Sequence, residues 1–309
     1  MRNMKNIEVI ERKGIGHPDT IADDLSERLS EELFREYKKV YGSPKHYNVD
    51  KTMVCAGEIQ NNKFTNPVKI VFAGQYTKLK NIDDILEKTV KDILSFEIKK
   101  GMKYEVYNFL NQGSPDLNDI FACQKANDTS FAVGLPESKN EKLVKEIGNY
   151  IDNLHKTDKH IGRDNKVMFV FDGKEKHIYI ALAFINNFKS KEEYFKYKKQ
   201  LEEKLKAKFK IKNIQINIGD TKELQFLTKT GTSLEMGDSG ATGRGNRRNG
   251  LITPTRPMTL EAYYGKNKIT HIGRTYQDLA ITMARKKKKN ILLLNKIGGD
   301  IKKPIVFEI

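Results

Sequence analysis

The apolar positions of this chain follow two spacings, one typical of helices and one typical of strands. Between residues 20 and 40 they recur every four positions, at Ile21, Leu25, Leu29, Leu33 and Tyr37. This spacing predicts an amphipathic helix. Thr20 and Asp23 resemble a capping box, so we expect the helix to begin just after residues 17–19.

One order of elements, strand-strand-helix-strand, is predicted twice along the chain. The first copy has the ranges 47–59, 68–76, 82–98 and 104–110. The second copy has the ranges 166–171, 177–184, 191–209 and 211–218. A third copy has a helix and two strands, at 272–287, 291–294 and 304–309. A strand at 6–10 and a helix at 141–154 lie outside these copies.

We therefore predict an α+β protein of three pseudo-repeated sheet-plus-helix units, of which the third is incomplete. The expected units are residues 20–125, 126–220 and 221–309, with residues 1–19 interleaved among them in space. A length of 309 residues is enough for two or three such units around a sizeable core.

Composition indicates a globular protein of a reducing compartment. Hydrophobic residues make up 38% and charged residues 31% of the chain, and no apolar run approaches the roughly 20 residues of a membrane span. The first residues are too polar for a signal peptide. Two cysteines, Cys55 and Cys123, disfavour a disulfide framework or a zinc site, so we expect a cytoplasmic protein.

The net charge of +16 favours anionic partners. Residues 285–289, RKKKK, close a predicted helix, where cations suit the helix dipole. They can be a solvated helix end or a nucleic-acid contact. No basic stripe with interleaved aromatic residues is present, which disfavours the nucleic-acid interpretation.

Residues 231–248 combine glycines with the carboxylate Asp238 and three arginines. Glycine-rich turns can present consecutive N–H groups to an anion, and arginine adds forked donors for phosphate. We interpret the segment as a polyphosphate cradle, in which the carboxylate implies a metal ion. The alternative is a disordered linker, although Leu234, Met236 and Leu251 would be unusual apolar anchors in one.

Further polar, irregular stretches lie between the predicted elements: 14–20, 111–119, 126–130, 163–166 and 265–274. In the first, His17 and Asp19 stand at the positive end of a predicted helix, where phosphate binds favourably. None of these stretches is a Walker A loop, a Rossmann fingerprint or a GxSxG motif.

Taken in order, however, the motifs resemble those of the S-adenosylmethionine synthetases (methionine adenosyltransferases), and most closely the archaeal type. The segments are ERKGIGHPDTIAD, NQGSPDL, ANDTSFAVG, the long TGTSLEMGDSGATGRGNRRNGLITPTRPMTLEA, and then GKN and HIGRTY. The resemblance implies three similar α+β units, a homodimer with active sites between flat sheet faces, ATP and L-methionine as substrates, and magnesium, usually with potassium, as cofactor. It implies no membrane partner.

The resemblance also implies roles for particular residues. His17 would stabilise the leaving triphosphate, and Asp19 would bind magnesium. Glu58 would bind the methionine ammonium group. The other residues matched to catalysis or to substrate binding are Lys166, Arg244, Lys266, Gln112, Gly113, Ser114, Asp116, Asp128, Asp164, Asp238 and Arg247.

Some positions depart from the bacterial pattern of this family. Thr20 replaces a lysine after GHPD, and Gly245 replaces a lysine after GDxGxxGR, whose charge Arg247 is expected to supply. The aspartate that binds a second metal has no clear counterpart. Archaeal relatives also continue beyond the last residues here. Because every motif precedes residue 275, we expect a minimal enzyme, with one face of the third sheet covered by a partner chain or left polar.

Two other functions remain open at this point. One is a catalytically inactive relative that binds or regulates, which the presence of His17, Asp19 and Asp238 disfavours. The other is a nucleic-acid-binding protein, for which binding would depend steeply on salt.

Overall fold

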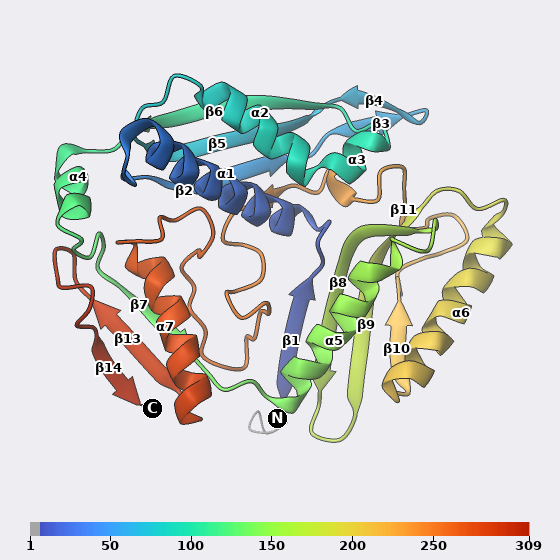
Figure 1. The fold of residues 1–309 in the computed structure, drawn as a ribbon. Coiled ribbons are helices and arrows are strands. Elements are labelled where there is room, and N and C mark those ends of the chain that lie inside the picture. The colour runs from blue at the N-terminus through green and yellow to red at the C-terminus, as the bar shows by residue number, and fades with distance from the viewer. Residues whose placement is uncertain (1–6, 309) are drawn as a thin grey trace.

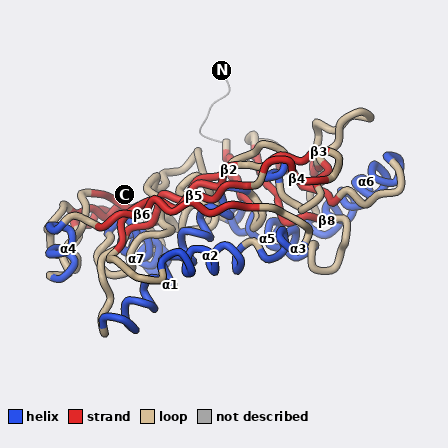
Figure 2. Tube along the Cα trace, turned by 90° about the horizontal axis from the view of Figure 1, so that it is seen from above, coloured by secondary structure: helices blue, strands red, loops and turns tan. Residues whose placement is uncertain are grey.

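A computed structural model of the chain describes residues 7–308. Three sheets are arranged around the centre, and the main helices pack against one side of them (Figure 1). Seen from above, helices α1, α2 and α5 lie along one side of the molecule and strands β2, β5 and β6 along the other (Figure 2). The chain is therefore a broad slab with a helical face and a sheet face, which confirms the predicted α+β class.

The first sheet has the strand order β12-β2-β5-β6. Its strands are β2 (Asn48–Cys55), β5 (Val68–Tyr76), β6 (Tyr104–Gln112) and β12 (Gly240–Ala241). Helices α1 (Pro18–Tyr41), α2 (Ile82–Ile93) and α3 (Ser95–Lys99) accompany it. β5 and β6 are parallel, so the chain between them crosses over through α2 and α3. A hairpin of β3 (Glu58–Gln60) and β4 (Lys63–Asn66) extends from it.

The five apolar residues that predicted the first helix are all buried in the core beneath this sheet. Because they recur every four residues, they form one stripe along α1 that packs on the inner face of the sheet. The predicted helix at 82–98 is divided at Leu94 into α2 and α3.

The second sheet has the order β1-β8-β9-β10, with β11 beside β9. Its strands are β1 (Glu8–Lys13), β8 (Ile161–Phe171), β9 (Lys176–Ile185), β10 (Asn213–Ile216) and β11 (Leu227–Thr228). Helices α5 (Lys139–Leu154) and α6 (Lys191–Phe209) belong to the same core. The start of α5 is a capping box, in which Ser138 and Glu141 each accept a hydrogen bond from the other's backbone N–H.

The third sheet has the order β14-β13-β7, covered on one face by α7 (Ile272–Lys287). Its strands are β7 (Ser130–Gly134), β13 (Ile291–Asn295) and β14 (Ile305–Glu308). Strand register places six residues together on the other face: Phe131, Val133, Leu292, Leu294, Ile305 and Phe307. The side chains of Phe131, Ile305 and Phe307 are exposed. We expected this face to be covered by a partner or polar, and it is apolar.

Strand pairing crosses the expected unit boundaries at four strands: β11 and β12, expected in the third unit, pair with β9 and β2, and β1 and β7 also cross. β1 pairs with β8 of the second sheet, as the predicted interleaving of residues 1–19 allows. β7, which we placed at the start of the second unit, pairs with β13 of the third sheet. The stretch 111–119, expected to be irregular, contains most of helix α4 (Pro115–Ala122). Within residues 7–308, no helix is long and apolar enough to span a membrane.

Candidate active site

The GHPD segment lies where β1 ends and α1 begins. Pro18 takes the first helical position, where its missing N–H is not needed, and His17 is the N-cap. The Nδ1 atom of His17 accepts a hydrogen bond from the backbone N–H of Asp19 at 3.2 Å. The proton of the neutral ring therefore lies on Nε2, which is left as a donor. Burial and the nearby Lys13 lower the pKa of His17 to about 4, so the ring is neutral near pH 7.

The predicted capping box of Thr20 and Asp23 is wrong. His17 caps the helix instead, because its ring nitrogen reaches the first free N–H of the helix. The Thr20 hydroxyl is buried with no hydrogen-bond partner among the residues that the structure describes. Asp23 accepts a hydrogen bond from the backbone N–H of Gly243 at 2.8 Å.

Asp19, the expected magnesium ligand, carries a cationic partner. Its Oδ2 accepts a hydrogen bond from Lys13 Nζ at 2.7 Å, and its Oδ1 accepts one from the backbone N–H of Ala241 at 3.0 Å. Burial acts to raise the pKa of Asp19, but these two hydrogen bonds outweigh it and lower the pKa. The group is therefore a charged carboxylate.

This arrangement fits a magnesium ion completed by a substrate. Within residues 7–308, no group of three or more His, Cys, Asp or Glu side chains could hold a metal alone. Mg²⁺ is commonly held by one or two carboxylates together with water and substrate phosphates. Asp19 supplies such a carboxylate, and the Lys13 ammonium occupies one of its oxygens.

Asp164 connects β8 with the glycine-rich loop. Its Oδ2 accepts hydrogen bonds from the backbone N–H of Ser233 at 2.9 Å and from the Ser233 hydroxyl. The same hydroxyl lies 3.2 Å from Oδ2 of Asp238. Burial raises the pKa of Asp164 to about 7, against the hydrogen bonds from Ser233. The structure thus joins two of the predicted residues, Asp164 and Asp238, through a serine.

Part of the backbone of the predicted cradle at 231–248 is bonded within the chain. The N–H groups of Ala241 and Gly243 donate to the carboxylates of Asp19 and Asp23. The N–H groups of the residues that follow each of them donate to backbone carbonyls. These four N–H groups are therefore already used, and the anion-binding role of the rest of the segment stays a prediction.

The loop also approaches the start of α1 very closely. A Cβ added to Gly240 would lie 2.1 Å from the carbonyl carbon and oxygen of Pro18. Only glycine permits this approach, which brings the N–H of Ala241 to Asp19.

The two predicted arginines of the loop differ in what they contact. The side chain of Arg244 is exposed, and within residues 7–308 it makes no hydrogen bond or ion pair. The guanidinium of Arg247 donates to the backbone carbonyls of Leu260, Gly243 and Gly245. Arg247 thus braces the loop, and its expected role as a substitute for the missing lysine stays a prediction. Arg244 remains available to an anion.

Glu58 lies at the start of β3 and pairs with the loop through a bridge to Met236. Both residues line a cavity of about 930 Å³ between the first and second sheets. The loop residue Gly237 lines the same cavity, so Glu58 belongs to the surroundings of Asp238.

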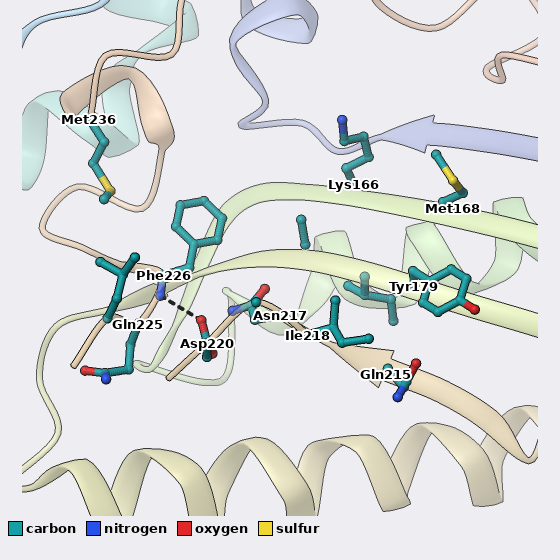
Figure 3. Close-up of a pocket in the computed structure, with 14 residues that line it drawn as sticks. Lys166, Met168, Tyr179, Gln215, Asn217, Ile218, Asp220, Gln225, Phe226 and Met236 are labelled. Atoms are coloured by element: carbon teal, nitrogen blue, oxygen red, sulfur yellow. Dashed lines mark hydrogen bonds between the residues drawn. The ribbon is translucent and has the colours of Figure 1, made fainter. Parts of the chain in front are cut away.

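Lys166 lies at the edge of a second cavity, of about 480 Å³, on the outer face of the second sheet. Lys166 and Met168 lie next to each other on β8, and Tyr179 lies on the neighbouring strand (Figure 3). The loop after β10 forms the opposite wall with Ile218 and Phe226. Apart from Lys166, this groove is largely apolar.

The remaining predicted residues lie elsewhere. Gln112 ends β6, Ser114 is the N-cap of α4, and Asp116 is in the first turn of that helix. Gly113 packs against His46: an added Cβ would lie 2.9 Å from its ring. Gln112 and Gly113 line a cavity of about 590 Å³ beside α4.

Asp128 lines an adjoining polar cavity of about 500 Å³, with Gln112, His46 and His271. Both histidines are buried, and burial lowers the pKa of each. The Nδ1 atom of each, and the Oδ1 atom of Asn48 in the same cavity, has no hydrogen-bond partner among the described residues. These unpartnered polar atoms mark the cavity as a place for a polar ligand.

Lys266 is buried close to this cavity. Its Nζ lies 2.6 Å from Oδ2 of Asp50 and 3.3 Å from Oε1 of Glu261. Burial would raise the pKa of Asp50, but Lys266 outweighs it and lowers that pKa to about 2. The ammonium group is thus held between two carboxylates.

The predicted residues therefore form two groups in one chain. We call the first the phosphate group, comprising His17, Asp19, Glu58, Asp164, Lys166, Asp238 and Arg244. We call the second the cavity group, comprising Gln112, Gly113, Ser114, Asp116, Asp128 and Lys266. Glu58 follows β2, whereas Gln112 ends β6 at the opposite end of the first sheet. Both views place α4 at one end of the molecule, and β8 lies well away from it, between the centre and α6 (Figures 1 and 2).

Three residues at these sites, Lys13, Ser233 and His46, were not predicted from the sequence. Lys13 stands directly before the first glycine of the GIGH segment, and no role was assigned to it from the sequence. Ser233 and His46 gave no signal, because their roles arise from contacts with residues far along the chain.

The fold is α+β, and the cations beside Asp19 suit an enzyme that binds an anionic substrate. Comparison with known proteins gives the family. The family model for S-adenosylmethionine synthetase (AdoMet synthetase) matches residues 1–309, so the chain belongs to this family, whose function is methionine adenosyl transfer.

Curated relatives agree with this assignment. The S-adenosylmethionine synthase of Sulfurisphaera tokodaii is 38% identical, over 97% of this chain and 84% of that protein. That of Methanoregula boonei is 36% identical, over 98% of this chain and 84% of that protein. An S-adenosylmethionine synthetase structure from Campylobacter jejuni shares the fold with a TM-score of 0.66 at 17% identity, covering 98% of this chain and 80% of that one.

Proposed function

We propose that the chain is an ATP:L-methionine S-adenosyltransferase. It would form S-adenosylmethionine and release pyrophosphate and phosphate. The observation that carries this proposal is the arrangement of the residues that we named the phosphate group. A neutral imidazole with a donor at Nε2 and the ammonium group of Lys13 lie beside one carboxylate, Asp19, and Lys166 stands opposite Lys13 on β8.

In this reaction the step that most needs assistance from the protein is the departure of triphosphate. The methionine sulfur attacks C5′ of the ATP ribose, the C5′–O bond breaks, and triphosphate leaves with the bonding electrons. The sulfur becomes a sulfonium without losing a proton, so no general base is required. Stabilising the charge that develops on triphosphate is then the main task. His17, which donates from Nε2, and Arg244 suit this task, and water afterwards cleaves the triphosphate.

The proposed cofactor is Mg²⁺, usually with K⁺ in this family, held by Asp19 and the substrate phosphates. When bound, it would neutralise phosphate charge. Asp19 is held in place for this role by the backbone N–H of Ala241.

We also propose a homodimer in which each active site takes the phosphate group from one chain and the cavity group from the other. The two groups lie at opposite ends of the first sheet, so a single folded copy does not bring them together. The outer sheet faces suit a partner, because they expose Phe109, Tyr179 and Phe307 on three separate sheets. Apolar faces of this kind mark interaction surfaces.

The test is an assay with ATP, methionine and Mg²⁺, in which S-adenosylmethionine, pyrophosphate and phosphate are measured. His17→Asn should lower turnover by about 10²–10⁴-fold, because a positioned donor to the leaving group is lost. His160→Asn, whose ring packs against Phe188 and hydrogen-bonds with Asn187, serves as the matched control and should keep full turnover. Binding of ATP without any product from the unmodified chain would identify a non-catalytic relative instead.

A further inference from the structure

Lys13 is the one cation in direct contact with Asp19 among the residues that the structure describes. It is the last residue of β1, and its side chain is only 11% exposed. Its Nζ donates to Oδ2 of Asp19 at 2.7 Å and to the backbone carbonyl of Arg244 at 2.8 Å. The next carboxylate, Glu11, lies 4.0 Å away. The ammonium group of Lys13 thus bridges Oδ2 of Asp19 and the backbone carbonyl of Arg244.

A second lysine stands directly opposite Lys13. In the antiparallel pair of β1 and β8, Lys13 is the register partner of Lys166. Residues in such positions project from the same face of the sheet, and like charges there destabilise the pair. Among the described residues, Asp19 is the one carboxylate in hydrogen-bonding contact with Lys13, so the repulsion between Lys13 and Lys166 is only partly balanced. An anionic ligand would balance the excess positive charge.

We propose that Lys13 and the divalent cation compete for the same oxygen of Asp19. This inference rests on the proposed function, which makes Asp19 a metal ligand. Without metal, the Lys13 ammonium holds the carboxylate charged and in place. Binding of a divalent cation at Oδ2 displaces that ammonium, which then faces the phosphate chain together with Lys166 and Arg244. Lys13 is therefore a positioning residue for the metal ligand and a counter-charge for the phosphates.

The competition predicts opposite effects on two ligands. Lys13→Met keeps the length of the side chain and removes its charge. Mn²⁺ binding to the full chain with tripolyphosphate bound and no nucleotide, measured by electron paramagnetic resonance, should become about tenfold tighter, because Asp19 loses its competing partner. Tripolyphosphate binding without metal, measured by calorimetry, should become about tenfold weaker, because a cation is lost. If Lys13 only stabilised the fold, Lys13→Met would weaken the binding of both Mn²⁺ and tripolyphosphate.

Lys166→Met is the matched control, since it removes the same charge from the partner position without touching Asp19. It should weaken tripolyphosphate binding but leave Mn²⁺ affinity within about twofold of the unmodified chain. Lys13→Arg keeps the charge and can hold the carboxylate with two N–H groups. It should weaken Mn²⁺ binding, so the proposal stays testable if Lys13→Met does not fold.

Unchanged, weaker or undetectable Mn²⁺ binding in a folded Lys13→Met variant would overturn the proposal. So would an equal gain in Mn²⁺ affinity for Lys13→Met and Lys166→Met, because that pattern reflects net charge alone. Neither measurement uses methionine or turnover. A chain that fails to make S-adenosylmethionine but shows the two opposite shifts would therefore contradict the proposed function and keep the role of Lys13.

Discussion

Single residues in the glycine-rich loop act by leaving space. Gly245 occupies the position where the bacterial pattern of the family has a lysine. A Cβ there would lie 2.1 Å from Oδ2 of Asp23, a carboxyl group that is 2% exposed and hydrogen-bonded by Gly243. Burial raises the pKa of Asp23 to about 8. A buried acid in this chain thus excludes any side chain at residue 245.

This steric conflict predicts the effect of a single methyl group. Gly245→Ala should lower the free energy of unfolding by about 1–3 kcal/mol, because the added carbon displaces the carboxyl group of Asp23 or the loop. Denaturant unfolding measures the change. Gly219→Ala is the matched control, since a Cβ there meets no atom within 4 Å and its backbone does not lie in the left-handed region. Equal stability of the two variants would contradict the close contact.

At the scale of elements, the site depends on how helix α5 joins two strands. Asp152, near the end of α5, accepts hydrogen bonds from the backbone N–H of Ile15 at 3.3 Å and from the side-chain amide of Asn165 at 2.8 Å. Its other oxygen pairs with Arg12 of β1 at 2.5 Å. One buried carboxylate therefore fixes the segment before His17 and the strand that carries Asp164.

Removing that carboxylate should disturb the site without touching a substrate. Asp152→Ala should cost about 3–5 kcal/mol of unfolding free energy, because it leaves the Arg12 guanidinium buried and unpaired. Turnover should fall as well, since the His17 segment loses its anchor. Asn149→Ala is the control, because Asn149 lies on the same helix and accepts a hydrogen bond from the same arginine at 3.1 Å, at an exposed position. A change of less than about 1 kcal/mol for Asp152→Ala would argue against the anchoring role.

At the scale of the whole molecule, the slab leaves its functional residues apart. The phosphate group and the cavity group lie at opposite ends of the first sheet, and the strands expose apolar side chains such as Phe109, Tyr179 and Phe307. A twofold dimer that buries these faces would bring the phosphate group of each chain to the cavity group of its partner, twice per dimer.

Complementation tests this arrangement directly. His17→Asn impairs the phosphate group, and Asp128→Asn impairs the cavity group, so each variant alone should be nearly inactive. Co-expressed chains that pair at random should recover about a quarter of the unmodified activity, because half of the dimers then carry one intact site of two. Activity no higher than that of the separate variants would show that each chain builds its own site.

The sequence alone predicted the elements whose side chains repeat regularly. Helices at 191–209 and 272–287 and the strand at 68–76 have the predicted bounds, because their apolar spacing directly reflects which face is buried. The order of motifs was sufficient to indicate the family, and the family model confirms that indication. The apolar spacing and the order of the motifs can both be read directly along the chain, without knowledge of its three-dimensional contacts.

Only the tertiary structure decided what the loop residues contact. The N–H groups of the glycine-rich loop bond to Asp19 and Asp23, which lie more than 200 residues earlier in the chain. β7 pairs with β13, and the register of β1 on β8 places Lys13 opposite Lys166. Such partners are chosen by packing and register between distant segments. The sequence determines them only through the fold, so no local spacing reveals them.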